Sequence, residues 1–177
     1  MLNVFVSRPT WVAKEFREGL AALSRVLGSH DLVPRTLGVT DYPRKSPMDE
    51  VIALLDECAG AVILGIPQLE VQKGTLKGEP LNAAIQLSTE WNHIEAGLAC
   101  ARGLPLLVIH NIGVSRGVFD HGAVGAFVYG VDLTRPAWPI EPEISGALQK
   151  WKRDCMAGRP ARARKTKKTK KPRGRRR

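Results

Sequence analysis

Glu95 is the acidic residue best placed to do chemistry, in the helix-like segment Ser88–Gly103 (STEWNHIEAGLACARG). On a helical wheel of about 100° per residue, the apolar arc consists of Trp91, Ile94, Leu98 and Ala101. Glu95 lies on the shoulder of that arc, one turn after Trp91. A carboxylate at the edge of a core-facing stripe is costly unless it is paired or open to a cavity. We therefore take Glu95 as the candidate catalytic residue.

A structural role is the alternative, in which Glu95 forms an ion pair with an arginine. Arg102 lies on the same side of the wheel. It is seven residues further on, which corresponds to about 10 Å along the axis and is far for a direct pair. The wheel alone leaves both roles open, so the elements around this helix have to be considered.

Apolar runs of strand length alternate with segments of helical period, which favours a parallel sheet covered by helices on both faces. The predicted strands are Leu2–Val6, Leu32–Leu37, Ala61–Ile66, Leu104–Ile109 and Gly125–Val131. The predicted helices are one capped by Thr10 and ended by Gly28, one begun at Ser46, one capped by Ser88 or Thr89, and Ile144–Met156. We expect an α/β fold, a flavodoxin-like three-layer sandwich with about five mainly parallel strands, and a long loop over Gln68–Leu87.

Ligands of such sheets bind at the C-terminal ends of the strands. Polar side chains in or near the loops that begin there, together with Trp91, are the candidate substrate contacts. They are Ser7, Arg8, Tyr42, Trp91, His110 and Arg116. No Cys or His spacing typical of a metal site occurs, so no metal ligand is predicted.

The positive charge of the chain is concentrated at its C-terminus. Residues 161–177 hold 11 of the 27 Lys and Arg and none of the 17 acidic residues, which leaves 16 basic and 17 acidic side chains in the other 160. We predict an α/β domain over residues 1–157 and a disordered basic tail over 158–177. The tail, residues 161–177, could contact nucleic acid non-specifically through phosphates, or act only as a solubilising extension.

The sequence also indicates where the chain resides. No apolar run approaches the roughly 20 residues needed to cross a bilayer, and the N-terminus (MLNVFVSRP) has no basic leader. We therefore expect no membrane partner and a cytoplasmic location.

Three segments together are similar to a known family. They are the strand Val4–Pro9 (VFVSRP), the loop Gly38–Ser46, and Thr89–His110 (TEWNHIEAGLACARGLPLLVIH). They resemble the Toll/interleukin-1 receptor (TIR) superfamily over roughly residues 1–135. The closest likeness is to bacterial TIR-like proteins and nucleoside 2-deoxyribosyltransferase-like proteins, of which this chain looks like a divergent member.

The resemblance implies that Glu95 is the catalytic glutamate of a hydrolase, an NAD glycohydrolase or ADP-ribose cyclase that acts in antiphage defence. NAD or a related nucleotide would be the substrate, with no cofactor, and the protein would form a homo-oligomer on activation. Trp91 would pack on the ribose or nicotinamide, and Ser7 and Arg8 would hold phosphate or ribose.

Two alternatives remain open at this point. The first is an N-glycosidase or deoxyribosyltransferase that acts on nucleosides or nucleotides through the same glutamate. The second is a non-enzymatic module that senses a nucleotide or associates with nucleic acid.

Overall fold

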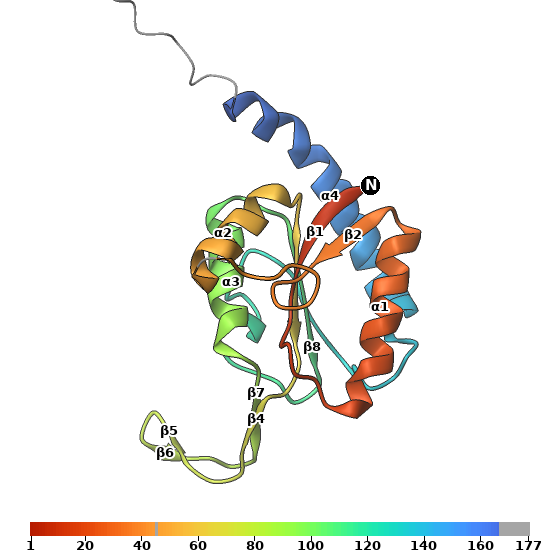
Figure 1. The fold of residues 1–177 in the computed structure, drawn as a ribbon. Coiled ribbons are helices and arrows are strands. Elements are labelled where there is room, and N and C mark those ends of the chain that lie inside the picture. Colours follow the sequence, from red (N-terminus) through yellow and green to blue (C-terminus); the bar gives the residue numbers. More distant parts are fainter. Residues whose placement is uncertain (45, 167–177) are drawn as a thin grey trace, which may run out of the picture.

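A computed structural model describes residues 1–44 and 46–166, with side chains to Gly158. Its centre is a five-stranded sheet in which every neighbouring pair is parallel (Figure 1). The strands are β1 (Leu2–Ser7), β2 (Leu32–Arg35), β3 (Ala61–Gly65), β8 (Leu106–Asn111) and β9 (Val128–Val131). Their order, β2-β1-β3-β8-β9, is the flavodoxin-like order for five sequential strands. The predicted fold class is confirmed.

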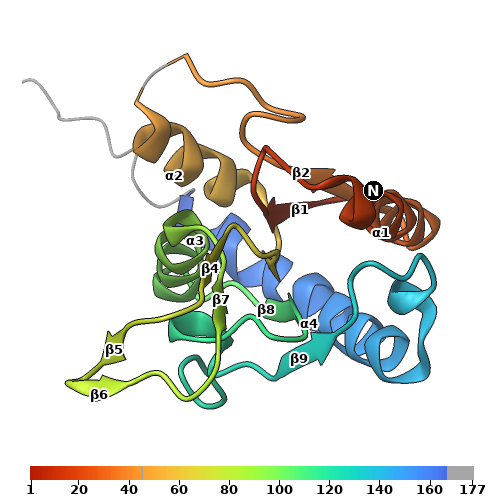
Figure 2. The same cartoon turned by 90° about the horizontal axis from the view of Figure 1, so that it is seen from below.

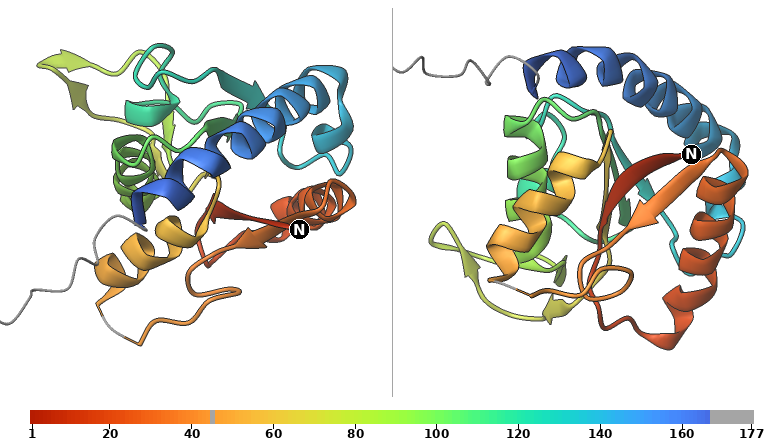
Figure 3. Two further views of the ribbon diagram at one scale, coloured as in Figure 1. Left: turned by 90° about the horizontal axis from the view of Figure 1, so that it is seen from above. Right: turned by 45° about the horizontal axis from the view of Figure 1, so that its top comes forward.

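Helices cover both faces of this sheet and complete three layers (Figure 3). One face carries α1 (Arg17–Ser29) and α4 (Pro142–Thr166), and the other carries α2 (Pro47–Glu57) and α3 (Glu90–Ala101). Three short 3-10 helices lie in the connections. They are η1 (Lys14–Phe16), η2 (Gly117–Phe119) and η3 (Trp138–Ile140).

The core is divided in two by the sheet. Every residue of β3 is buried, as expected for a central parallel strand. Val62 and Leu64 face the cluster beneath α1 and α4, whereas Ala61 and Ile63 face the cluster beneath α2 and α3. The side chains that alternate along β3 therefore pack against both helical layers.

The helix starts follow the predicted capping residues in two of three cases. Ser46 accepts a hydrogen bond from the Asp49 amide and begins α2, and Thr89 accepts one from the Trp91 amide and begins α3. The prediction that Thr10 caps the first helix is wrong. That α-helix begins at Arg17, directly after η1, and its N-cap residue is Phe16, whose side chain has no hydrogen-bond acceptor.

The expected loop Gln68–Leu87 is an arm with strands of its own. Strand β4 (Leu69–Val71) pairs antiparallel with β7 (Ile85–Leu87), and β5 (Thr75–Leu76) pairs with β6 (Glu79–Pro80) at the tip. Lys77 and Gly78 both have positive φ, which fits a two-residue hairpin turn. Figure 2 shows the arm projecting away from the sheet.

The last helix is longer than predicted. It begins at Pro142 and ends at Thr166, beyond the predicted domain boundary at residue 157. The rest of the predicted tail, residues 167–177, lies outside the described residues. Within the described part of the chain, no helix combines the length and the apolar character needed to cross a bilayer.

Candidate functional site

The site lies where the connections leave the sheet in opposite directions. β1 and β3 are neighbours, with Ser7 in register with Ile63. The chain after β1 leads to α1 on one face, and the chain after β3 leads through the arm to α3 on the other. In open parallel sheets this divergence creates the crevice that binds ligands.

Three buried polar residues meet at this point. Ser7 ends β1 and is 1% exposed, Asn92 is fully buried in the first turn of α3, and Glu95 follows one turn later at 8% exposure. The Asn92 Nδ2 amide donates a 2.7 Å hydrogen bond to Ser7 Oγ. A side-chain hydrogen bond also joins Ser7 to Glu95. Since the Ser7 oxygen already accepts from Asn92, its own proton is available to the carboxylate.

The buried face of α3 differs from the predicted apolar arc. The residues that face the sheet are Asn92, Glu95, Ala96 and Ala99. Trp91 and Ile94 are instead 38% and 39% exposed, so Glu95 lies on the buried face and not on its shoulder. The small alanines explain the difference, because they let α3 pack closely on β1 and β3 without large side chains between them.

Burial sets the protonation of the candidate catalytic group. Removal from water raises the pKa of Glu95 from 4.5 to about 7, because the charged form loses hydration. The hydrogen bond with Ser7 acts in the opposite direction and lowers this pKa. The carboxyl group is therefore poised to exchange a proton near neutral pH, a frequent property of functional sites.

The proposed ion pair between Glu95 and Arg102 is absent. Arg102 Nε donates instead to Asp56 Oδ1 at 2.8 Å, which ties α3 to α2. The ion pairs found among the described residues do not include Glu95. The structural alternative for this glutamate thus lacks its partner.

A cavity of about 390 Å³ opens beside Glu95. Its walls include Arg8, Trp11, Leu37, Gln68, Trp91 and Glu95. Glu95 is the one acidic residue of the lining and Arg8 the one basic residue, both within the described part of the chain. The volume lies in the range of small-molecule sites.

The loop after β2 contributes Leu37, Gly38 and Pro43 to the cavity wall and is held in part by an arginine. Arg35 Nε donates to Asp41 Oδ2 at 2.9 Å, and Arg35 Nη1 contacts Glu57 Oε2 of α2 at 3.3 Å. Hydrogen bonding to Arg35 lowers the pKa of Asp41, so this clamp is charged at neutral pH. It fixes the segment that brings Leu37 and Gly38 to the cavity.

The structure brings together some of the predicted substrate contacts and separates others. Arg8 and Trp91 line the cavity with Glu95, and Ser7 lies beneath it.

Tyr42 is 75% exposed and does not line the cavity, although Pro43 beside it does. His110 packs on Phe119 with ring centroids 5.8 Å apart, away from the cavity lining.

Arg116 also lies outside this cavity. Its backbone amide donates to Asp120 Oδ1 at 2.8 Å, so the bond joins the residues that flank η2. The residue that sequence reasoning missed is Asn92. The signal was present as polar and small residues at i, i+3, i+4 and i+7, which share one helix face.

In chemical terms the cavity offers one buried carboxyl group, one guanidinium and two indole rings. Among the described residues no cluster of three or more His, Cys, Asp or Glu side chains could hold a metal ion. The arrangement suits stabilisation of a developing positive charge on a ligand that also carries an anion. Comparison of the chain with protein-family models, curated proteins and solved structures found no match.

Proposed function

We propose that this protein cleaves an N-glycosidic bond of a nucleotide, with the nicotinamide–ribose bond of NAD as the preferred substrate. The observation that carries the proposal is Glu95 itself. It is a buried carboxyl group without an ion-pair partner among the described residues, and it lines a cavity at the ends of β1 and β3. Such a group is costly to the fold, which favours a functional reason for it.

The absence of a second acid in the cavity lining favours a leaving group that needs no protonation. Nicotinamide in NAD is a cation, and it departs as a neutral base with the electron pair of the C–N bond. The ribose C1′ then develops oxocarbenium character, which an adjacent carboxylate stabilises. Water adds to C1′ and loses a proton, so the products are ADP-ribose, nicotinamide and one proton.

The raised pKa of Glu95 is compatible with this reaction. The free carboxyl group is partly protonated near pH 7 because its charged form is poorly hydrated. A bound pyridinium ring would bring a second positive charge to this cavity, in addition to that of Arg8. Substrate binding should therefore lower the pKa of Glu95 and restore the carboxylate that catalysis requires.

The other cavity residues have complementary tasks. Trp91 precedes Glu95 by one turn and is positioned to pack on the ribose or the nicotinamide ring. Arg8 can hold a phosphate oxygen. Ser7, through its hydrogen bonds with Glu95 and Asn92, orients the carboxyl group.

A second candidate function is favoured by the same raised pKa. A Glu95 that keeps its proton near pH 7 could act as a general acid towards the neutral base of a nucleoside or nucleotide. The protein would then be an N-glycosidase or deoxyribosyltransferase. The two candidates differ in the protonation state of Glu95 that is active, and so in the direction of their pH dependence.

The biological setting is proposed on the resemblance described above. It suggests a nucleotide signal in bacterial antiphage defence, either through consumption of NAD or through cyclisation of the ADP-ribose product. It also suggests that a homo-oligomer forms on activation. Assays should therefore include high protein concentration and a crowding agent, so that an assembled form is sampled.

The test is release of nicotinamide from NAD by the wild type, Glu95→Gln and Glu90→Gln. Glu90 is an exposed glutamate of the same helix that does not line the cavity, so its change is the matched control. We expect the wild type and Glu90→Gln to be equally active and Glu95→Gln to lose at least about 100-fold. Equal turnover by the wild type and Glu95→Gln would contradict the proposal.

A panel of nucleosides and nucleoside monophosphates, assayed for free base, separates the two candidates. Base release from this panel without nicotinamide release from NAD would support the second candidate. Failure of the assembled wild type on both substrate classes would contradict both.

A further inference from the structure

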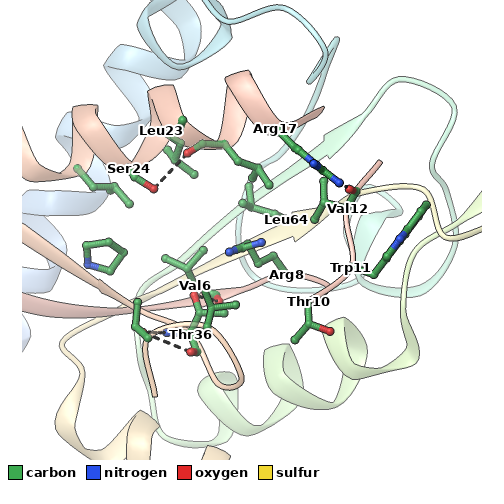
Figure 4. A pocket seen from close by; sticks show the side chains of 16 residues that line it. Val6, Arg8, Thr10, Trp11, Val12, Arg17, Leu23, Ser24, Thr36 and Leu64 are labelled. Carbon is green, nitrogen blue, oxygen red and sulfur yellow. Dashed lines mark hydrogen bonds between the residues drawn. The ribbon is translucent and has the colours of Figure 1, made fainter. Parts of the chain in front are cut away.

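A second cavity, of about 440 Å³, lies between α1 and the C-terminal ends of β1 and β2. We call it the α1 cavity. Residues that define it include Val6, Arg8, Leu23, Ser24, Thr36 and Leu64. Figure 4 shows the Arg8 side chain extending between Val6 and Leu64, with Leu23 and Ser24 of α1 above it.

The α1 cavity and the Glu95 cavity meet along one short segment. Arg8, Thr10 and Trp11 line both of them. This segment follows β1 directly, so the two cavities lie on either side of the chain where it leaves the sheet. A ligand longer than either cavity could therefore occupy both and pass Arg8 at the junction.

The Arg8 side chain is a cation that takes part in none of the ion pairs found among the described residues. It is half-buried, and its Nη1 donates a hydrogen bond to the adjacent Pro9 carbonyl at 3.3 Å. Loss of hydration lowers the pKa of Arg8. Besides Arg8, the charged residue in the lining of the cavity beside Glu95 is Glu95 itself, and the charged residue in the lining of the α1 cavity is Arg17. A phosphate would satisfy this guanidinium with charge-assisted hydrogen bonds.

The walls of the α1 cavity combine apolar and polar side chains. Its inner surface is formed by buried aliphatic side chains of β1, β3 and α1, namely Val6, Leu64 and Leu23. Polar groups line the cavity as well, among them Arg17 and Thr40. Thr36 Oγ1 donates to the Val6 carbonyl, and Ser24 Oγ donates to the Leu20 carbonyl. Buried aliphatic side chains beside hydroxyl and guanidinium groups suit a ligand that joins a planar base to polar substituents.

We propose that the α1 cavity binds the nucleoside monophosphate half of a dinucleotide, with Arg8 holding phosphate at the junction and the other half reaching Glu95. The inference rests on the proposed function for the identity of the ligand. It deepens that function, because it assigns one half of the dinucleotide to the α1 cavity and makes a dinucleotide, and not a mononucleotide or nucleoside, the ligand that fills both cavities.

The experiment is isothermal titration calorimetry with AMP on the full chain carrying Glu95→Gln. Ser24→Trp places an indole in the α1 cavity, because Ser24 lines that cavity and not the one beside Glu95. Ser29→Trp is the matched control. Ser29 is also an exposed serine of α1 whose hydroxyl bonds a helix carbonyl, but it lines neither cavity.

We expect AMP to bind, Ser24→Trp to raise its Kd at least tenfold, and Ser29→Trp to leave the Kd unchanged. Adenosine, which lacks the phosphate, should bind at least tenfold more weakly than AMP. AMP should also bind Arg8→Gln at least tenfold more weakly than it binds the protein with Arg8. Ala21→Phe, at another exposed position that lines the α1 cavity, replaces Ser24→Trp if thermal melting shows that variant to be unfolded.

Absence of AMP binding, or AMP binding that neither blocking variant weakens, would overturn the inference. These results are separable from the fate of the proposed function. Nicotinamide release without AMP binding at the α1 cavity would leave the proposed function standing and remove the inference. If Ser24→Trp weakens AMP binding but the protein cleaves no N-glycosidic bond, the α1 cavity would stand as a nucleotide site and the proposed function would fall.

Discussion

Ser7 at the end of β1 and Asn92 in the first turn of α3 are joined by a 2.7 Å hydrogen bond, although 85 residues separate them in sequence. The bond fixes the start of α3 over the strand end. The same Ser7 hydroxyl also lowers the pKa of Glu95 through hydrogen bonding. The protonation of Glu95 is therefore coupled to the contact between strand and helix.

Ser7→Ala should move the pH dependence of catalysis. The hydrogen bond with Ser7 lowers the pKa of Glu95, so its loss should raise that pKa above about 7. If the carboxylate is the active form, the acid limb of the kcat/KM profile for NAD shifts to higher pH. Ser29→Ala, on the exposed end of α1, should leave the limb in place. An acid limb that stays or moves to lower pH in Ser7→Ala would contradict this role.

Arg102→Gln should leave the same pH profile unchanged. Arg102 forms an ion pair with Asp56, whereas burial and Ser7 set the pKa of Glu95. The exposed pair should contribute less than about 1 kcal/mol to stability. A marked shift of the acid limb in Arg102→Gln would mean that the arginine reaches Glu95 in solution.

Glu95 should make the protein less stable as pH rises. Its folded-state pKa of about 7 exceeds the unfolded value near 4.5, so the folded protein retains a proton that the unfolded chain releases between these pH values. The free energy of unfolding should fall by about 2–3 kcal/mol between pH 5 and pH 8 from this group. Denaturation of Glu95→Gln by urea should lack that part of the slope, whereas Glu90→Gln should keep it. Identical slopes in the wild type and Glu95→Gln would contradict the raised pKa.

Trp91 should matter for substrate binding and its neighbour Ile94 should not. The two side chains are almost equally exposed on α3, but Trp91 lines the Glu95 cavity and Ile94 does not. We expect Trp91→Ala to raise KM for NAD about tenfold, with a smaller change in Trp91→Phe. Steady-state kinetics of Ile94→Ala provide the control. An equal effect at both positions would indicate a general disturbance of α3.

Two glycines should respond oppositely to alanine. A methyl group at Gly60 would overlap Cys155 Sγ and lie 3.0 Å from Trp151 Cζ2, beneath α4. Gly60→Ala should therefore destabilise the protein by about 1–3 kcal/mol. Gly97 lies on the exposed face of α3 with open space around it, and Gly97→Ala should stabilise by about 0.5–1 kcal/mol. Urea denaturation checks both signs.

The layers of this fold could be predicted because each depends on local pattern. The run Ala61–Gly65 is apolar at every residue, which only a strand covered on both faces can accommodate in a sheet. Ser46 with Asp49 marks a helix start through a contact three residues apart. The arm was not predicted, because its strands are two or three residues long and largely exposed, so they carry no apolar alternation.

Part of the candidate site could also be predicted, because it depends on residues close together in the sequence. Glu95 and Trp91 share one helix, so their relation follows from helical geometry. The face that this helix turns to the sheet could not be predicted from helical geometry. Trp91 and Ile94 are larger and more apolar than Ala96 and Ala99, so the wheel placed the apolar face on their side. Packing against β1 and β3 favours the smaller side chains, a preference that only the sheet reveals.

The arm between β3 and α3 has a closed base. The Gln68 amide donates to the Leu87 carbonyl at 2.8 Å, so the chain leaves and re-enters the domain at adjacent points. Changes in the number of residues between them need not alter the distance from β3 to α3. The turn at Lys77 and Gly78 is thus a natural insertion point, where a peptide tag, a fluorophore or a whole second module could be grafted without displacing Glu95.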